Sequence, residues 1–283
     1  MALNLRWRAT TSLTVEAEGL APETLSSMSA AEVRRRKVSL GNSEVELGEL
    51  FEIEGSAEDG HLTLEGDLRQ VDRLGEGMST GTLTIRGDVG AELGAEMTGG
   101  RIDVDGHVGD WAGAEMRGGV LRIRGGAGRS LGSAYPGSRL GMRDGIILVE
   151  GTIGDDAGLA MRRGLIAVTG SAGEGLGRGM IAGSIFAFGP VGGFPGAGMK
   201  RGTLAFFAGE DVSERRLLPT FAPSGRSRPP FLSVYLRQLR TWGFPVPDTA
   251  FSGPLERYNG DLAERGQGEI WVEPSRALAR PGV

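Results

Sequence analysis

Residues 164–180 read GLIAVTGSAGEGLGRGM, and residues 183–199 read GSIFAFGPVGGFPGAGM. Both stretches place Gly at positions 1, 7, 10 and 14 and Met at position 17, and they begin 19 residues apart. The first glycine of the repeat also falls at Gly81, Gly100, Gly119, Gly145 and Gly202, with a weaker copy at Gly60. Repetition at a constant period is typical of a solenoid, in which each unit packs on its neighbours.

The five residues after the first glycine of each repeat alternate in character, which is the two-residue period of a β-strand. Their second and fourth positions are aliphatic or aromatic: Leu62/Leu64, Leu83/Ile85, Ile102/Val104, Leu121/Ile123, Ile147/Val149, Ile166/Val168, Ile185/Ala187 and Leu204/Phe206. Two further apolar series follow at the same step: Val89, Val108, Ala127, Ile153, Ala172 and Val191, and Met78, Met97, Met116, Met142, Met161, Met180 and Met199. Closely spaced glycines exclude helices here. The repeat therefore predicts an all-β fold, a right-handed parallel β-helix of about 19-residue coils.

The repeat divides the chain into three predicted regions. Residues 1–59 are expected to cap the rod with strands and a short helix, which the capping box at Ser29 opens. Alternating apolar residues predict the strands: Leu3, Leu5, Trp7, Leu13 and Val15. Residues 60–209 form the predicted β-helix. Residues 210–283 are expected to cap the open last coil. Within them we expect an irregular stretch at 219–230 and an amphipathic helix at 230–242.

Composition excludes several classes of protein. The 283 residues contain no cysteine, which excludes disulfides, thiolate zinc sites and cysteine-held iron–sulfur clusters on this chain. The net charge of −5 gives no reason to expect nucleic acid as a partner. His61 and His107 fall at different places in the repeat, so we expect surface turn residues and no metal site. We find no catalytic arrangement, no membrane span and no signal peptide, and we expect a cytoplasmic protein.

Two irregularities carry more information than the repeat itself. One coil is seven residues longer than its neighbours, and the extra length falls at 133–140, where a recognition loop is expected. The other is the outward face of the strands, which is polar in the early coils and apolar from Ile146 onward. Because a monomer does not normally expose a continuous apolar strip, either the C-terminal segment or a partner protein covers it, and the sequence leaves both open. The candidate partner-interface residues are Ile146, Leu148, Leu165, Phe186, Phe188 and Phe207, with Tyr135 and Arg139 from the loop.

The repeat resembles the GXGXG β-helix domain that the C-terminal part of glutamate synthase shares with the C-subunit of formylmethanofuran dehydrogenase. The lead-in from Gly41 to Gly55 is similar to the N-terminal segment of that subunit. The stretch from Arg257 to Ile270 is similar to the tail of the methylotroph version, which belongs to the formyltransferase/hydrolase complex. The resemblance covers roughly residues 40–270.

This resemblance implies a non-catalytic scaffold in one-carbon metabolism. The complex would transfer a formyl group between tetrahydromethanopterin and a furan-type carrier, methylofuran or methanofuran, and release formate. Formyltransferase and amidohydrolase-like subunits would be the partners, and no cofactor is expected on this chain. The alternatives are the C-subunit of a molybdenum or tungsten formylmethanofuran dehydrogenase, a glutamate-synthase-like spacer module, and a freestanding enzyme with a groove along the rod. Because the carrier of the resembled systems bears a polyglutamyl tail, we also consider a steering role for four arginines near the loop: Arg122, Arg124, Arg129 and Arg139.

Overall fold

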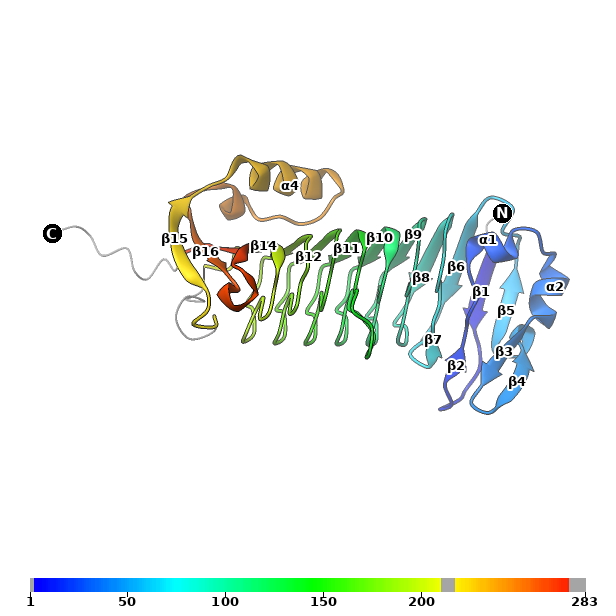
Figure 1. Ribbon diagram of the computed structural model, residues 1–283. Helices are drawn as coiled ribbons and strands as arrows, with labels where there is room; N and C mark the ends of the chain where they lie inside the picture. Colours follow the sequence, from blue (N-terminus) through cyan, green and yellow to red (C-terminus); the bar gives the residue numbers. More distant parts are fainter. Residues whose placement is uncertain (1–2, 210–216, 275–283) are drawn as a thin grey trace.

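The computed structural model describes residues 3–209 and 217–274, and it is mostly β. Thirteen strands form one long, largely parallel sheet in the order β15-β16-β17-β14-β13-β12-β11-β10-β9-β8-β6-β1-β5 (Figure 1). Its strands are β1 (Leu3–Trp7), β5 (Phe51–Glu54), β6 (His61–Glu65), β8 (Thr82–Arg86), β9 (Arg101–Val104), β10 (Arg117–Ile123), β11 (Asp144–Val149), β12 (Leu165–Val168), β13 (Ser184–Ala187), β14 (Arg201–Phe206), β15 (Ala222–Ser227), β16 (Leu255–Gly260) and β17 (Gln267–Val272). From β6 to β14 the strands pair in chain order, as the repeat predicts.

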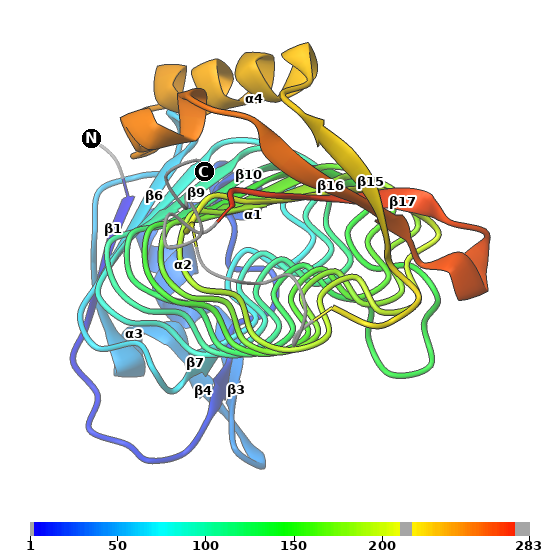
Figure 2. The ribbon, with the colours of Figure 1, turned by 90° about the vertical axis from the view of Figure 1, so that its left-hand side faces the viewer.

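Each strand from β8 to β14 lies in register with the strand one repeat away. Leu83 of β8 pairs with Ile102 of β9, and Ile166 of β12 pairs with Ile185 of β13. A second ladder of isolated parallel bridges joins the later apolar series: Leu68, Val89, Val108, Ala127, Ile153, Ala172 and Val191. We call one strand and the chain that follows it, up to the next strand, a coil. The coils superimpose when the stack is viewed along its length (Figure 2).

The interior of the stack holds one continuous apolar core. The inward residues of the strands are buried, and the seven repeated methionines have no exposed surface. The predicted aliphatic ladders and methionine series are therefore confirmed.

Some repeat glycines are needed because neighbouring coils approach closely. A Cβ on Gly170 would lie 2.4 Å from the carbonyl carbon and oxygen of Gly151 in the preceding coil. The equivalent Cβ on Gly106 would lie 2.4 Å from the carbonyl oxygen of Gly87. Real Cβ atoms do not approach backbone this closely, so any side chain here would push the coils apart.

The N-terminal region continues the stack and adds a small second sheet. β1 pairs in parallel with β6 and antiparallel with β5. The second sheet has the order β4-β3-β2-β7, from β4 (Ser43–Glu46), β3 (Lys37–Leu40), β2 (Val15–Glu16) and β7 (Val71–Asp72). The short helices are α1 (Pro22–Leu25), α2 (Ala30–Arg35) and α3 (Leu47–Leu50), and the predicted capping box at Ser29 is present on α2. The strand prediction was wrong for Leu13, which lies in a local turn where its amide donates to the Thr11 hydroxyl.

The C-terminal segment extends the sheet and then crosses its outer side. β17 pairs in parallel with β14, and β16 and β15 follow in antiparallel order. The predicted amphipathic helix is α4 (Pro230–Thr241), which lies over the strands of the later coils (Figure 1), and two short 3-10 helices follow, η1 (Asp248–Phe251) and η2 (Leu262–Glu264). The prediction of irregular chain at 219–230 was wrong for Ala222–Ser227, which form β15. This strand lies at the sheet edge, where Pro223 costs no ladder hydrogen bond. Within the described residues no helix combines the length and apolarity needed to cross a bilayer.

Candidate functional site

The apolar strip predicted from the sequence is present on the outward face of β11 to β14. Leu148, Ala167 and Phe186 occupy one register row across three successive strands. Leu148, Leu165, Phe186 and Phe207 are buried, whereas Ile146 and Phe188 are half-buried. These side chains belong to a second hydrophobic cluster, separate from the core inside the stack.

The C-terminal segment covers the strip. Leu232, Leu236 and Leu239, on the inward side of α4, have no exposed surface and pack in the same cluster as the strip. Phe186 meets Tyr235 of α4 edge to face at 5.5 Å between ring centroids. The rings of Phe188 and Phe207 stack at 5.1 Å. The sequence left open whether the C-terminal segment or a partner protein covers the strip. In the structure the C-terminal segment covers it.

Arg122 holds this covering segment against the strands, and Arg228 braces the segment internally. Arg122, from β10, donates to the backbone carbonyls of Trp242 at 3.0 Å and Gly243 at 2.7 Å, and also pairs with Glu150. Arg228 donates to three carbonyls around η1: Ala250 at 2.8 Å, Ser252 at 2.6 Å and Gly253 at 2.6 Å. Burial lowers the pKa of the Arg228 guanidinium from its ordinary value. Each of these hydrogen bonds has a charged donor, which makes it stronger than a neutral one.

The end of the segment is anchored by a buried carboxylate. Asp261, between β16 and η2, accepts hydrogen bonds from the amides of Gly198 at 3.0 Å and Ala263 at 3.0 Å. Burial opposes the charged form of Asp261, but the neighbouring Thr220 side chain and the two amides outweigh it, so the pKa of Asp261 lies below its usual value. This contact joins the C-terminal segment to the last repeated coil.

The seven-residue insertion lies against the outside of the stack. Tyr135 stacks on Trp111 at 5.2 Å between ring centroids, and its hydroxyl donates to Glu92 at 3.0 Å. Burial, with the nearby Glu92 carboxylate, raises the pKa of Tyr135 well above its usual value. Arg139, near the tip, is exposed. Tyr135 therefore fixes the base of the loop, and the contact of Arg139 with a partner stays a prediction.

The other arginines considered for steering have partners inside the chain. Arg124 pairs with Asp105 at 2.5 Å, and Arg129 lies 3.9 Å from Asp155. Arg122 holds the covering segment as described above. A steering role for this set stays a prediction, and Arg139 is its member with no ion pair in the described part of the chain.

Neither histidine lies in a ligand cluster. His107 is exposed, and its Nδ1 accepts a hydrogen bond from the Gly126 amide of the next coil at 2.9 Å. His61 is exposed at the start of β6. Across residues 3–209 and 217–274, no group of three or more His, Asp or Glu side chains is placed to hold a metal ion.

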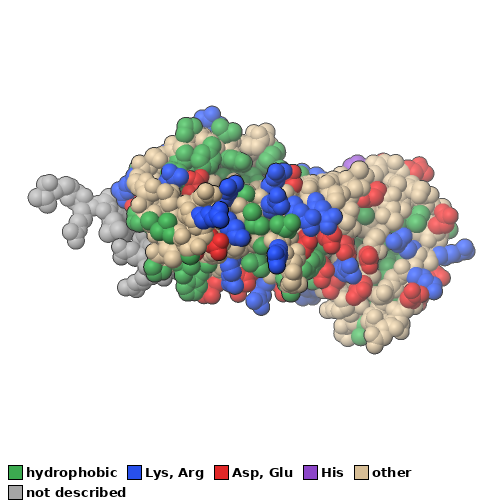
Figure 3. Space-filling model, viewed as in Figure 1, with side chains coloured by type: hydrophobic (Ala, Val, Ile, Leu, Met, Phe, Trp, Pro, Cys, Tyr) green, Lys and Arg blue, Asp and Glu red, His purple; other side chains and the backbone are tan. Residues whose placement is uncertain are grey.

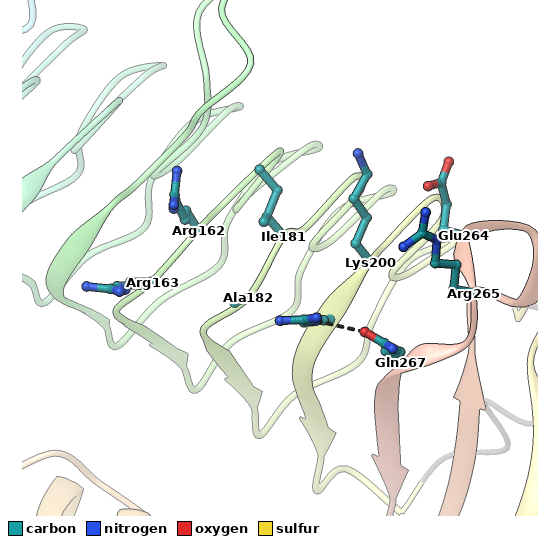
Figure 4. Close-up of a pocket in the computed structure, with 9 residues that line it drawn as sticks. Arg162, Arg163, Ile181, Ala182, Lys200, Glu264, Arg265 and Gln267 are labelled. Carbon is teal, nitrogen blue, oxygen red and sulfur yellow. Dashed lines mark hydrogen bonds between the residues drawn. The ribbon is translucent and has the colours of Figure 1, made fainter.

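One feature was missed by our reading of the sequence. A surface hollow of about 510 Å³, which we call the basic hollow, lies between the later coils and η2. Its charged lining side chains are Arg162, Arg163, Lys200, Arg201, Arg265 and Glu264 (Figure 4). Lys and Arg side chains gather on this side of the molecule (Figure 3). The sequence does contain a signal for this hollow. The two residues that follow a repeated methionine are both basic at 162–163 and again at 200–201.

Comparison with solved structures finds a relative over nearly the whole chain. It is a chain of the formyltransferase/hydrolase complex (FhcABCD) from Methylorubrum extorquens, whose crystal structure contains methylofuran. The TM-score is 0.87 and the identity 35%, over 96% of this chain and 100% of that chain.

Curated proteins match over a shorter segment. The C-subunit of the molybdenum-containing formylmethanofuran dehydrogenase 1 of Methanothermobacter marburgensis is 40% identical over 81 residues, which are 28% of this chain and 20% of that protein. The C-subunit of the formyltransferase/hydrolase complex Fhc of Methylorubrum extorquens is 37% identical over 89 residues, 31% of this chain and 33% of that protein. The aligned segments thus span a fifth to a third of these relatives. No family model matches the chain.

Proposed function

This chain belongs to the C-subunit family of the formyltransferase/hydrolase complex and formylmethanofuran dehydrogenase, and from that membership we propose that it is a non-catalytic scaffold subunit of a formyltransferase/hydrolase complex. The observation that carries the proposal is the match to a chain of the FhcABCD complex, at 35% identity over 96% of this chain and 100% of that chain. A chain that matches one component over its full length is expected to occupy the same place in an assembly.

The proposed chemistry belongs to the complex and not to this chain. A formyltransferase subunit and an amidohydrolase-like subunit would transfer a formyl group between tetrahydromethanopterin and methylofuran or methanofuran, and would release formate. This chain would supply a rigid flank against which those subunits pack. We infer that its coils form a right-handed parallel β-helix, because crossover connections between parallel strands are right-handed in about 98% of cases.

The interactions of the charged side chains support the scaffold role. Several strand and corner charges pair between neighbouring coils, as Arg86 does with Glu65 and Arg117 with Glu96. Carboxylates also bind the backbone of the next coil, as Asp110 accepts from the Arg129 amide at 2.7 Å and Asp155 from the Glu174 amide at 2.8 Å. These groups hold the stack together.

The second candidate is the C-subunit of a formylmethanofuran dehydrogenase, favoured by the 40% identity over 81 residues. The two assemblies differ in composition, since the dehydrogenase would contain molybdenum or tungsten. The metal content of the purified assembly therefore separates them.

The test is co-expression of an affinity-tagged full-length chain with the genes of its source organism that match the other three Fhc subunits. We expect these polypeptides to co-purify, formyl transfer and formate release to require all of them, and the isolated chain to be inactive. An isolated chain that performs either reaction, or a tagged chain that retains none of the polypeptides, would overturn the proposal.

A further inference from the structure

The basic hollow is built from two rows of side chains on three successive coils. Arg162, Ile181 and Lys200 form one row and point the same way (Figure 4), and Arg163, Ala182 and Arg201 form the other. The middle coil contributes the shorter, uncharged Ile181 and Ala182. The hollow arises there, because the longer basic side chains stand on either side of it.

The backbone holds these rows in register. The amides of Arg162, Ile181 and Lys200 donate to the carbonyls of the methionine one coil earlier at 2.8, 2.7 and 2.7 Å. Coils in a parallel sheet lie about 4.8 Å apart, so the two basic coils are separated by about 10 Å. The cations are therefore carried on a rigid support at a defined spacing.

The same register position is neutralised in the earlier coils. Arg117 pairs with Glu96 at 2.8 Å, and Arg143 pairs with Glu115 at 3.1 Å. Each of these carboxylates stands immediately before a repeated methionine, at 96 and 115. One coil before Arg162, Ile181 and Lys200, that position is Gly141, Ala160 and Gly179. The later coils therefore contain cations at 162–163 and 200–201 without a carboxylate at the position that pairs with the cation in the earlier coils.

The cations of the hollow are exposed and little compensated. Arg201 donates to the side-chain oxygen of Gln267 at 2.8 Å, and in the described part of the chain Arg162, Arg163, Lys200 and Arg265 form no ion pair. Five cations and the single carboxylate of Glu264 leave the lining with a net charge of +4, in a chain whose net charge is −5. Like charges held this close repel one another, and an anionic partner relieves that repulsion.

We propose that the basic hollow binds an acidic polypeptide segment of a partner protein, with carboxylates about 10 Å apart; this inference rests on the proposed function, because it supplies one docking contact of the scaffold. Arginine forks suit carboxylates, which they bind through two parallel hydrogen bonds. A nucleic-acid strand fits less well. Among the described lining residues none is aromatic to stack a base.

The direct test measures binding of a fluorescent 12-residue peptide to the purified full-length chain. Every third residue of the peptide is Glu and the others are Ser, which spaces the carboxylates by about 10 Å in an extended chain. The double variant Arg162→Glu/Lys200→Glu should bind at least about tenfold more weakly. The matched control is Arg35→Glu/Arg237→Glu, which makes the same charge change at two exposed cations elsewhere. It should bind within about twofold of the unchanged chain. Rising NaCl should weaken binding, because exposed charges are screened.

Three outcomes would overturn the inference: no binding by the unchanged chain, equal losses in both double variants, or tighter binding of a 12-nucleotide oligothymidylate or of tripolyphosphate than of the peptide. A circular dichroism melt of each variant verifies that it is folded.

Co-purification separates failure of this inference from failure of the proposed function. We expect the Arg162→Glu/Lys200→Glu chain to retain less of the partner polypeptides than the control variant at the same salt concentration. If both retain them equally, the inference fails and the proposed function stands. If the unchanged chain retains none, the proposed function fails, and the peptide measurement still decides whether the hollow selects acidic polypeptides.

Discussion

The early strands, β8 to β10, and the later strands, β11 to β14, share one interior but differ on their outer faces. Inside, both groups bury aliphatic and methionine side chains completely. Outside, Asp103 of β9 is partly exposed and pairs with Arg101 at 2.5 Å. At the same register position of β13, Phe186 is fully buried beneath α4.

This difference separates what the repeat requires from what it leaves free. The interior and the close backbone approach at the corner glycines must recur in every coil, because each coil packs on the next. The outward side chains are not part of the packed interior. They can therefore contact water, the chain's own helix or a partner without disturbing how the coils stack. Specific function is therefore expected on the outer side of the stack.

The largest expected effect comes from Phe186→Ala, which removes a ring from the contact between β13 and α4. We expect a loss of about 3–5 kcal/mol in the free energy of unfolding, since the cavity forms in a closely packed cluster. Asp103→Ala, at the equivalent early position, should cost less than about 1 kcal/mol, because it removes a partly exposed ion pair. Urea unfolding measures both. Equal losses would contradict the contrast between the two outer faces.

Glycine substitutions test whether the interior is uniform. In Gly106→Ala and Gly170→Ala the new Cβ would lie 2.4 Å from backbone of the preceding coil. We expect each variant to lose about 1–3 kcal/mol of stability, through the strain of forcing the coils apart. The two losses should agree within the error of urea unfolding, although one glycine is in the early half and the other in the later half. A large loss at one site only would show that the halves are not equivalent inside.

Replacing Asp261 tests how the C-terminal segment is anchored on the last coils. Asp261→Asn should cost about 1–2 kcal/mol at neutral pH, because it removes the charged acceptor of two amide hydrogen bonds. The folded-state pKa of Asp261 lies below its ordinary value, so its contribution is present above that ordinary value and disappears as the pH falls through the folded-state pKa. Urea unfolding at several pH values should show the unchanged chain approaching the variant in acid. A stability difference that persists undiminished at the lowest pH would contradict this role.

The smallest effect is expected on the early outer face. Arg124→Ala removes one partner of the ion pair with Asp105, in which both side chains are largely exposed. Solvent screens such a pair, so the stability should change by no more than about 1 kcal/mol. The thermal midpoint, measured with and without 0.5 M NaCl, checks this. A loss as large as that of Phe186→Ala would mean that the early face is also a packed contact.

The interior was predictable from the sequence because each residue there obeys the same geometric constraint. Inward aliphatic positions, the methionine series and α4 all followed from periodicity. Periodicity did not predict whether α4 or a partner covers Phe186, because an apolar surface predicts burial but not what buries it. β15 was missed because proline and serine disfavour strands in general, yet are tolerated at a sheet edge. The basic hollow was missed because its charges come from separate coils and from η2, and only the stack brings them together.

Hydroxyl-radical footprinting of the purified, full-length chain tests most directly whether α4 is what covers the later coils. The account predicts that Phe186 and Phe207 resist modification as well as Phe206 inside the core, while Val234, Tyr235 and Trp242, which are exposed on or beside α4, are modified. Modification of Phe186 and Phe207 at rates like those of Tyr235 would contradict it, because the strip would then be open in the isolated chain.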